Sequence, residues 1–168
     1  QETMRRVQLK RLPEFIEARK HNWETLRKGL AAHESSLEFA LPTHAKSWDP
    51  EQGFAWDESG CRTDCSWFGF KIAVKPEALF TRTELAQELD RNKIGNRMLF
   101  GGNLVRQPAF VQLREDRPDS MRLVGDLADS DQIMNNTLFL GTYPGLTSEM
   151  LDCEIDVIKA FVTSKTNG

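Results

Sequence analysis

An apolar stripe near the start of the chain constrains the fold more strongly than any other feature of the sequence. Its members recur at spacings of three and four, with one arginine among them, and are Leu12, Phe15, Ile16, Arg19, Trp23, Leu26 and Leu30. This periodicity places them on one face of a helix. Because Pro13 lacks an N–H and clashes with a preceding helical turn, we expect it in the first turn of a helix from about residue 12 to 30, after an earlier helical piece. Such a strong stripe on an otherwise charged helix requires a partner surface.

Three short segments have the composition of β-strands. Residues 66–74 are aromatic and β-branched, and Asp64 and Pro76 bound them. Gly69 inside this segment predicts a bulge or a close approach of another backbone. Residues 96–100 and 137–141 are shorter segments of the same kind. We therefore expect three strands, far enough apart in sequence to be separated by helices.

Helical signals fill the intervals between these strands. Thr81 and Glu84 form a capping box that begins a helix over residues 81–94, and Gly95 is expected to end it. Thr147 caps a final helix over residues 147–163. Two shorter helices are expected, over residues 107–113 and 126–136.

The region between the first helix and the first long strand is expected to be irregular, apart from a short strand over residues 37–41. Residues 44–60 carry Trp48, Phe54 and Trp56, which either pin this loop onto its own domain or contact a partner. The whole order predicts an α+β fold, with a small sheet of about three strands covered by helices on one face.

Composition excludes several classes of function. The chain has 168 residues and a net charge of −3, which gives no reason to expect binding to nucleic acid or to an acidic membrane surface. No apolar run is long enough to span a bilayer, and the N-terminus has no signal-peptide core. Three cysteines without a dense framework suit a reducing cytosol, so a cytoplasmic location is expected. Because position 1 is not Met, we expect a processed or excised piece of a longer chain.

Read alone, the sequence assembles no catalytic centre. The spacing of Cys61 and Cys65 is not that of a zinc knuckle, and an iron–sulfur cluster normally needs four cysteines. The three histidines are far apart, and no Ser or Cys stands in a nucleophile-elbow context. Asp126, Asp129 and Asp131 are expected to start a helix rather than bind calcium. We therefore assign no catalytic residue, no cofactor-binding residue and no metal ligand.

The segment that spans residues 93–110 is the strongest candidate for ligand binding. Two glycines, Gly101 and Gly102, form a turn that permits positive φ and close backbone approach. Arg97 and Arg106 stand on either side of it, and a guanidinium can hold a phosphate or carboxylate through a fork of donors. The alternative is a hairpin-like corner whose arginines are solvated, cap a carbonyl, or pair with an acid such as Glu115.

Four segments resemble the C-terminal region of the sugar 3-dehydratases in the DegT/DnrJ/EryC1/StrS superfamily of pyridoxal-phosphate-related sugar aminotransferases. They are residues 8–17, 65–70, 96–108 and 136–147, with sequences such as Gly-Gly-Asn-Leu-Val-Arg-Gln-Pro and Thr-Leu-Phe-Leu-Gly-Thr-Tyr-Pro-Gly-Leu-Thr. The resemblance covers about residues 7–162, and residues 1–6 fall outside it. The branch that it points to is that of the CDP-6-deoxy-L-threo-D-glycero-4-hexulose 3-dehydrases.

This resemblance implies the architecture and chemistry of a longer enzyme. Residues 1–34 would be a helix linking two domains, and residues 35–168 the small α+β C-terminal domain of a fold-type-I enzyme whose large cofactor-binding domain is absent here. The family's dehydrase uses pyridoxamine phosphate, a histidine in place of the usual lysine, and its own [2Fe–2S] cluster, which relays electrons from a flavin/iron–sulfur reductase partner. It removes the C3 hydroxyl of a CDP-4-keto-6-deoxyhexose in dideoxysugar and O-antigen (lipopolysaccharide) synthesis, and is expected to be a homodimer.

By the same resemblance, Arg97, Asn103, Arg106 and Gln107 are expected to contact the phosphates or hydroxyls of the nucleotide-sugar. The chain alone is expected to be inactive and to bind no cofactor. Two alternatives remain. One is a fragment of a related sugar aminotransferase or of a dehydratase without the cluster, and the other is a free-standing, non-catalytic binding or assembly module.

Overall fold

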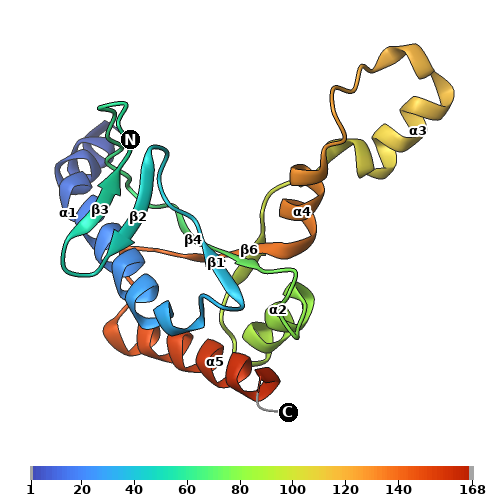
Figure 1. Cartoon of the computed structure of the whole chain (residues 1–168). Coiled ribbons are helices and arrows are strands. Elements are labelled where there is room, and N and C mark those ends of the chain that lie inside the picture. Colours follow the sequence, from blue (N-terminus) through green and yellow to red (C-terminus); the bar gives the residue numbers. More distant parts are fainter. Residues whose placement is uncertain (1, 167–168) are drawn as a thin grey trace.

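The computed structural model describes residues 2–166, and the side chains of residues 7–166. Its main sheet has four antiparallel strands in the order β1-β4-β6-β5 (Figure 1). These are β1 (Leu37–Phe39), β4 (Gly69–Val74), β6 (Thr137–Gly141) and β5 (Asn96–Met98). The three main strands predicted from the sequence share this sheet, and the short strand predicted over residues 37–41 is present as β1, the fourth strand, at its edge. The prediction of an α+β fold with a small, helix-covered sheet is confirmed.

Strand pairing gives the sheet one apolar and one mixed face. In β4, burial alternates strictly, with Phe70, Ile72 and Val74 buried. Phe70 pairs with Leu140 and Ile72 with Leu138, so the buried residues of β4 and β6 lie on the same face. Residues directly opposite in an antiparallel pair share a face, so the other face carries Lys71, Phe139 and Arg97 in one row.

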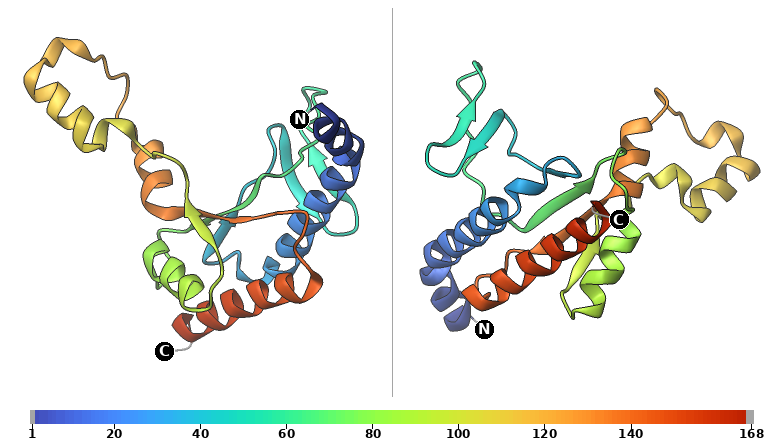
Figure 2. Two further views of the ribbon diagram at one scale, coloured as in Figure 1. Left: turned by 180° about the vertical axis from the view of Figure 1, so that it is seen from behind. Right: turned by 60° about the horizontal axis from the view of Figure 1, so that its bottom comes forward.

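Three helices cover the apolar face. They are α1 (Glu2–Gly29), α2 (Arg82–Arg91) and α5 (Ser148–Thr166), and Figure 2 shows α1 and α5 running side by side beneath the sheet. The core contains Leu26 from α1, Leu30 directly after this helix, and Leu151 and Ile158 from α5, each at most 2% exposed. The C-terminal half of the predicted stripe therefore packs against a surface of the same chain.

The first helix differs from the prediction at Pro13. Helix α1 is continuous through this residue instead of beginning near residue 12. Proline removes one backbone hydrogen bond and crowds the preceding turn. The N-terminal half of α1 accommodates this because Leu9 and Leu12 are exposed there, 66% and 47%, so no core packing opposes a small adjustment.

The helix that follows Thr81 also ends earlier than predicted. Its capping box is confirmed, since Thr81 Oγ1 accepts from the Glu84 amide at 3.2 Å and Glu84 Oε2 accepts from the Thr81 amide at 2.8 Å. However, the helix ends at Arg91, and Lys93 rather than Gly95 adopts positive φ, at 59°. The left-handed residue that closes the helix is therefore a lysine, which tolerates this conformation less readily than glycine.

The region expected to be an irregular loop forms a β-hairpin instead. Strands β2 (Ala45–Asp49) and β3 (Gly53–Trp56) pair with each other, separately from the main sheet. Asp49 Oδ1 accepts hydrogen bonds from the amides of Glu51 and Gln52, at 2.8 and 2.9 Å, and Gly53 has φ of 76°. These features make the tight turn. The hairpin's Trp48 and Phe54 pack against the core, which confirms that the aromatic residues pin this segment onto its own domain.

Residues 101–136, which we call the arm, project away from the sheet between β5 and β6 (Figures 1 and 2). The arm contains η2 (Leu104–Arg106), α3 (Pro108–Asp116), η3 (Pro118–Ser120) and α4 (Ala128–Asn136); a further short helix, η1 (Ala31–His33), follows α1. Both predicted short helices are thus present. Neither α3 nor α4 has a buried residue, so the arm has no core of its own.

No helix within residues 2–166 has the length and apolarity that crossing a membrane would require.

Trp23 is at the centre of the core, 1% exposed, and its ring stacks on Trp67 with centroids 4.5 Å apart. Trp23→Ala is expected to lower the free energy of unfolding by about 3–5 kcal/mol, since it leaves a large cavity. Urea denaturation followed by circular dichroism measures this change. The control Leu79→Ala, at a side chain that is 70% exposed, should shift stability by no more than about 0.5 kcal/mol. Equal losses in both variants would contradict the central position of Trp23.

The Glu84 carboxylate makes stability depend on pH. The Lys165 ammonium donates to it at 2.7 Å and, with Thr81, lowers the pKa of Glu84 from 4.5 to about 2. Because the folded pKa is the lower one, this stabilisation is present above about pH 4.5 and is lost as pH falls toward 2. The melting temperature of Glu84→Gln should therefore fall less than that of wild type between about pH 5 and about pH 2.5, a range that covers most of this window. Glu77→Gln, at an exposed loop position, should behave as wild type.

Candidate functional site

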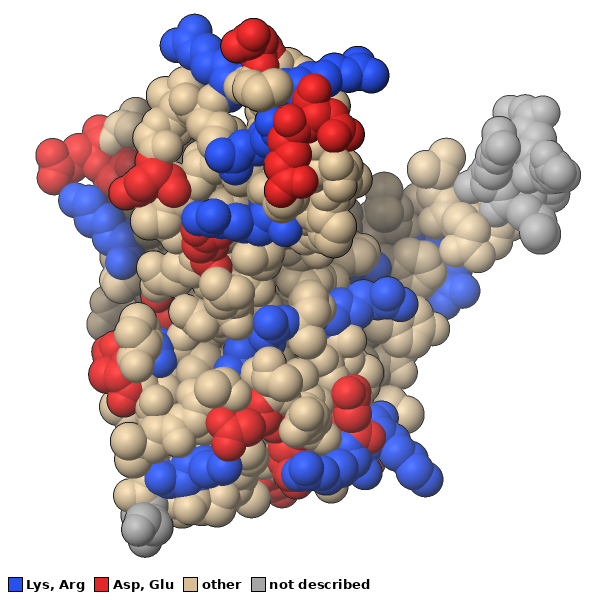
Figure 3. All heavy atoms as spheres, turned by 90° about the vertical axis from the view of Figure 1, so that its right-hand side faces the viewer, with Lys and Arg blue, Asp and Glu red and all other residues tan. Residues whose placement is uncertain are grey.

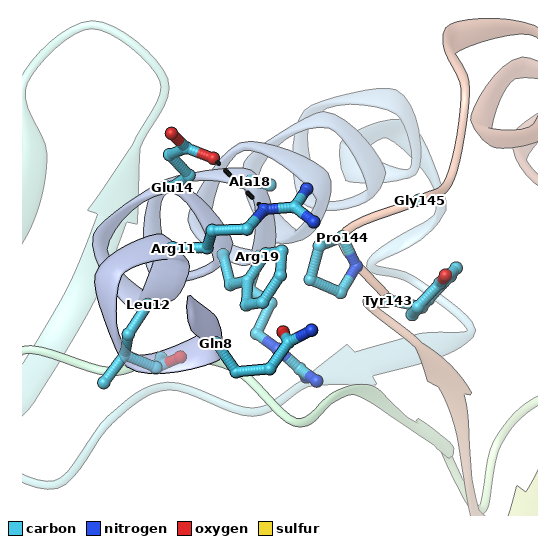
Figure 4. A pocket seen from close by; sticks show the side chains of 11 residues that line it. Gln8, Arg11, Leu12, Glu14, Ala18, Arg19, Tyr143, Pro144 and Gly145 are labelled. Atoms are coloured by element: carbon cyan, nitrogen blue, oxygen red, sulfur yellow. Dashed lines mark ion pairs between the residues drawn. The ribbon is translucent and has the colours of Figure 1, made fainter. Parts of the chain in front are cut away.

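Two adjoining hollows lie where α1 meets the segment that follows β6, and we call them together the groove. The first has a volume of about 700 Å³ and is lined by residues of α1 and by the turn at residues 143–145 (Figure 4). The second, about 610 Å³, lies over the mixed face of the sheet and is lined by Phe68, Arg97 and Phe139 among others. Arg19 and Tyr143 line both hollows, so they form the boundary between them.

Hydrogen bonds to backbone carbonyls fix the boundary. Arg19 Nη1 donates to the Trp67 carbonyl at 2.9 Å, and Thr142 Oγ1 donates to the same oxygen at 2.6 Å. Asn22 Nδ2 donates to the Tyr143 carbonyl at 2.8 Å. Asn22 and Thr142 are 3% and 0% exposed, and buried polar groups that are fully paired hold their neighbours rigidly. The groove therefore has a preformed wall.

The floor of the second hollow depends on a glycine. A Cβ atom at Gly69 would lie 2.9 Å from the Leu140 carbonyl and against the Phe139 ring. The predicted close backbone approach at Gly69 is confirmed, since it lets Phe139 lie across the sheet. The Phe139 ring in turn contacts Phe68, with ring centroids 5.7 Å apart. Arginine and aromatic side chains are thus exposed together, an arrangement suited to an anionic ligand with a flat or apolar portion.

The four residues predicted to bind substrate fall into two places. Arg97 is exposed on β5 and lines the second hollow. Asn103, Arg106 and Gln107 lie together at the base of the arm, and none of them lines either hollow. The structure therefore brings three of the four predicted residues together and separates Arg97 from them.

The base of the arm is held by a polar network around Asp131. Arg106 forms a two-pronged ion pair with this carboxylate, with Nε 3.2 Å from Oδ1 and Nη2 2.8 Å from Oδ2. Asn103, 4% exposed, donates to Asp131 Oδ1 at 2.8 Å. Arg106 and then Asn103 lower the pKa of the Asp131 carboxyl. Arg106 thus pairs with an acid, and this acid is Asp131 rather than Glu115.

The turn itself explains the paired glycines. Gln107 Nε2 donates to the Gly101 carbonyl at 2.8 Å. Gly102 has φ of 60°, and a Cβ atom there would lie 2.8 Å from the Cβ of Met134 in α4. Positive φ and a close approach were both expected of this turn. Here the close approach is to the arm's own helix.

Cysteines and histidines do not form a metal site within the part of the chain that the structure describes. No group of three or more His, Cys, Asp or Glu residues in that part could hold a metal ion. The free thiols are Cys61 and Cys153, both exposed, and Cys65, whose pKa is raised by burial.

His44, Asp57 and Ser59 do come together, beside the β2–β3 hairpin. His44 Nδ1 lies 3.0 Å from Asp57 Oδ2 and 3.3 Å from Ser59 Oγ. Ser59 and then His44 lower the pKa of Asp57 to about 2. A catalytic relay needs the serine and the acid on opposite ring nitrogens, whereas both approach Nδ1 here. This cluster therefore holds a loop in place.

Charge gives no sign of a nucleic-acid surface on the face toward which the arm projects. Figure 3 shows lysine, arginine, aspartate and glutamate side chains interspersed there. A nucleic-acid interface would instead gather positive charge over one surface.

Sequence reasoning missed Arg19, Tyr143 and the aromatic pair of Phe68 and Phe139. The sequence does give an indication for Arg19, because this residue lies at helical spacing within an apolar stripe. A charged residue on a face that is otherwise buried normally has a specific partner. Tyr143 occurs in the sequence analysis only within the motif of the family resemblance; in the structure it lies in a turn, where the Leu146 amide donates to the Tyr143 carbonyl at 3.1 Å. Nothing local in the sequence indicates that these residues meet.

Comparison with known proteins gives a consistent result. The model of the DegT/DnrJ/EryC1/StrS aminotransferase family matches residues 1–161. The chain is 40% identical over 155 residues to the lipopolysaccharide biosynthesis protein RfbH of Salmonella typhimurium, covering 92% of the chain and 30% of that protein. It is 36% identical over 159 residues to a dTDP-4-dehydro-2,6-dideoxy-D-glucose 3-dehydratase of Saccharopolyspora spinosa, covering 95% of the chain and 29% of that protein. The chain thus spans about a third of the length of these relatives.

Among solved structures, the fold is similar to that of the E. coli GDP-4-keto-6-deoxy-D-mannose-3-dehydratase with bound hydrated PLP. The TM-score is 0.67 at 22% identity, and the match covers 90% of the chain and 32% of that structure. At this identity the likeness concerns the fold alone.

The Arg106–Asp131 pair is expected to anchor the arm. Asp131→Asn keeps the shape of the side chain but removes its charge, so hydrogen–deuterium exchange should speed up throughout α3 and α4 while the exchange of β4 and α5 stays unchanged. Because the folded pKa of Asp131 is lowered, acidification below its ordinary value should loosen the wild-type arm in the same way. Asp129→Asn, an exposed position of the same helix, is the control. Comparable exchange in both variants would show that the pair does not hold the arm.

Proposed function

Because the chain belongs to the DegT/DnrJ/EryC1/StrS aminotransferase family, we propose that it is the C-terminal small domain of a nucleotide-sugar 3-dehydrase. The 36% identity to a named 3-dehydratase across 95% of the chain carries this proposal. The 40% identity to a lipopolysaccharide biosynthesis protein supports a role in dideoxysugar and O-antigen synthesis. The parent enzyme would act in the cytoplasm and remove the C3 hydroxyl of a CDP-4-keto-6-deoxyhexose.

The proposed division of the chain is the one that the family resemblance implies. Residues 1–34 would link the two domains of the parent enzyme, and residues 35–168 would form the small domain. The exposed N-terminal half of α1, with Leu9 and Leu12 on its surface, and the groove beside it supply a surface that the large domain would cover. The parent enzyme would be a homodimer, supplied with electrons by a flavin/iron–sulfur reductase.

The cofactors would bind mainly outside this chain. When bound, pyridoxamine phosphate supplies an electron sink that makes loss of the C3 hydroxyl possible. The groove fits a phosphate, since Arg19 and Arg97 line it, but no lysine lines either hollow. A [2Fe–2S] cluster normally needs four cysteine thiolates, and the cysteines form no metal-binding cluster within the part of the chain that the structure describes. We therefore assign the acid–base residues and any cluster ligands to the rest of the parent enzyme.

What this chain contributes, in this proposal, is orientation of the substrate. Arg97 would contact the phosphate or hydroxyls of the nucleotide-sugar from the second hollow. Arg106 uses Nε and Nη2 for Asp131, and its side chain is still 55% exposed, so its remaining edge would contact the substrate. Asn103 and Gln107 would complete this contact by holding the turn beside it. Both arginines would exclude water from the sugar when the domains close around it.

A sugar aminotransferase is the second candidate, because the matching family model bears that name. The two activities use the same cofactor and a similar substrate. They differ in whether the sugar loses a hydroxyl or gains an amine.

The decisive experiment uses the intact enzyme that contains this chain. It is incubated with CDP-4-keto-6-deoxyglucose in two parallel reactions, one with pyridoxamine phosphate and a reductase system and one with pyridoxal phosphate and glutamate, and the products are analysed by mass spectrometry. Loss of the C3 oxygen supports the dehydrase, and transfer of an amine from glutamate supports the aminotransferase. The dTDP- and GDP-linked sugars are tested in parallel, which separates the choice of nucleotide from the reaction.

In the same enzyme, Arg97→Ala should weaken binding of the nucleotide-sugar about tenfold to a hundredfold, the usual cost of a lost charge-assisted hydrogen bond. Arg97→Lys should weaken it less, because it retains the charge and loses only the fork. Isothermal titration calorimetry gives the affinities, and thermal melting monitors folding. An unchanged affinity in Arg97→Ala would remove Arg97 from the site, whatever reaction the enzyme catalyses.

A further inference from the structure

Tyr143 occupies a position that its role in a turn does not explain. It is the only tyrosine of the chain, and its side chain is 65% exposed although it separates the two hollows of the groove. Large aromatic side chains that serve only packing are normally buried. This ring is instead exposed to solvent, and it lines the second hollow together with Arg19 and Arg97.

The backbone of Tyr143 is held more firmly than an exposed residue requires. Its carbonyl accepts from the buried Asn22 at 2.8 Å, and the preceding Thr142 is 0% exposed and donates to the Trp67 carbonyl. The ring lies against Gly145, where a Cβ atom would come within 2.9 Å of the ring carbon Cζ. A larger residue at position 145 would therefore displace the ring. The turn thus fixes the backbone position of Tyr143 and the orientation of its exposed ring.

The chemistry of this position suits a sugar. A tyrosine ring offers an apolar face for the C–H groups of a pyranose and a hydroxyl that can donate to an oxygen, and it loses little conformational entropy on binding. The guanidinium groups of Arg19 and Arg97 line the same hollow and suit the phosphate to which that sugar is joined. A ligand lying along the groove would therefore place its sugar–phosphate junction at Tyr143.

We propose that Tyr143 is a specificity-determining residue, whose ring packs on the hexose of the nucleotide-sugar and whose hydroxyl donates to an oxygen of that hexose. This assignment rests on the proposed function, because it takes the ligand to be a nucleotide-sugar. It concerns binding alone and requires no chemical step at Tyr143.

The first test uses the intact enzyme that contains this chain, labelled with 3-fluorotyrosine, in which the ¹⁹F resonance that is missing from the Tyr143→Phe variant is assigned to Tyr143. The resonance should move and saturate on titration with CDP-glucose, and should move much less with CDP alone, since CDP lacks the sugar. A CDP-glucose titration that leaves the resonance unchanged, or equal shifts with both ligands, would overturn the assignment.

The second test uses the intact enzyme and separates sugar binding from stability. Tyr143→Ala should raise KM for the nucleotide-sugar about tenfold or more, Tyr143→Phe about threefold through loss of the hydroxyl, and Gly145→Ala should raise KM by displacing the ring. Affinity for CDP and kcat should change little. Phe100→Ala, at a more exposed aromatic residue (79%) that lines neither hollow, is the control.

The outcomes distinguish a failure of the role of Tyr143 from a failure of the proposed function. If the wild-type enzyme dehydrates a nucleotide-sugar and the Tyr143 variants keep its KM, the role of Tyr143 is wrong and the proposed function stands. If wild type acts on no nucleotide-sugar, the proposed function fails and the role of Tyr143 fails with it. If Tyr143→Ala melts at a much lower temperature, Tyr143→Phe decides, because it keeps the ring and the packing on Gly145.

Discussion

The packing of Trp23 against the aromatic residues around it is the contact on which the rest of the structure depends. Its ring is nearly parallel to that of Trp67, at 7°, and meets Trp48 edge-on, with centroids 5.6 Å apart. One side chain therefore joins α1 to the segment that leads into β4 and to the β2–β3 hairpin. Aromatic side chains bury more area than any others, so a sheet of only four short strands gains a large core from a few residues. The position of α1, and with it that of Arg19 and Asn22, follows from this contact.

Trp67 connects the aromatic core to the wall of the groove. Its ring belongs to the aromatic cluster, while its carbonyl accepts from both Arg19 and Thr142. The wall of the groove is thereby attached to the most rigid part of the molecule, as precise binding of a ligand requires. The base of the arm is organised differently, since it depends on the polar network of Asn103, Arg106 and Asp131. The two places where predicted binding residues occur therefore differ in how firmly they are held.

Local chemistry made the main elements predictable. The strand around Phe70 and Ile72 follows from its β-branched and aromatic composition, and the capping box at Thr81 follows from two residues three apart. The β2–β3 hairpin could not be predicted in the same way, because β2 contains Lys46 and Ser47 and shows no clear alternation of apolar residues. The continuity of α1 through Pro13 depends on the absence of opposing packing, which the sequence does not show.

The candidate site was less predictable because its contacts are long-range. Arg106 was identified by its type and by the turn before it, yet its partner lies 25 residues further along the chain. Asp131 was expected only to help start a helix and does lie in the first turn of α4, but its pairing with Arg106 depends on how the arm folds back. Tyr143 and Asn22 are 121 residues apart, so their meeting is a property of the tertiary structure. Resemblance to a family identified the motif of Tyr143, but only the coordinates show that its ring borders the groove.

The arm interrupts two strands that are direct neighbours in the sheet, since β5 precedes it, β6 follows it, and the two pair antiparallel. In topological terms it is a greatly enlarged hairpin loop. The entropy of closing a loop rises only slowly with its length, and α3 and α4 contribute no buried residue to the core. The outer part of the arm can therefore be lengthened or shortened without changing the register of the sheet, whereas its base is fixed by the contacts of Asn103, Arg106 and Gln107.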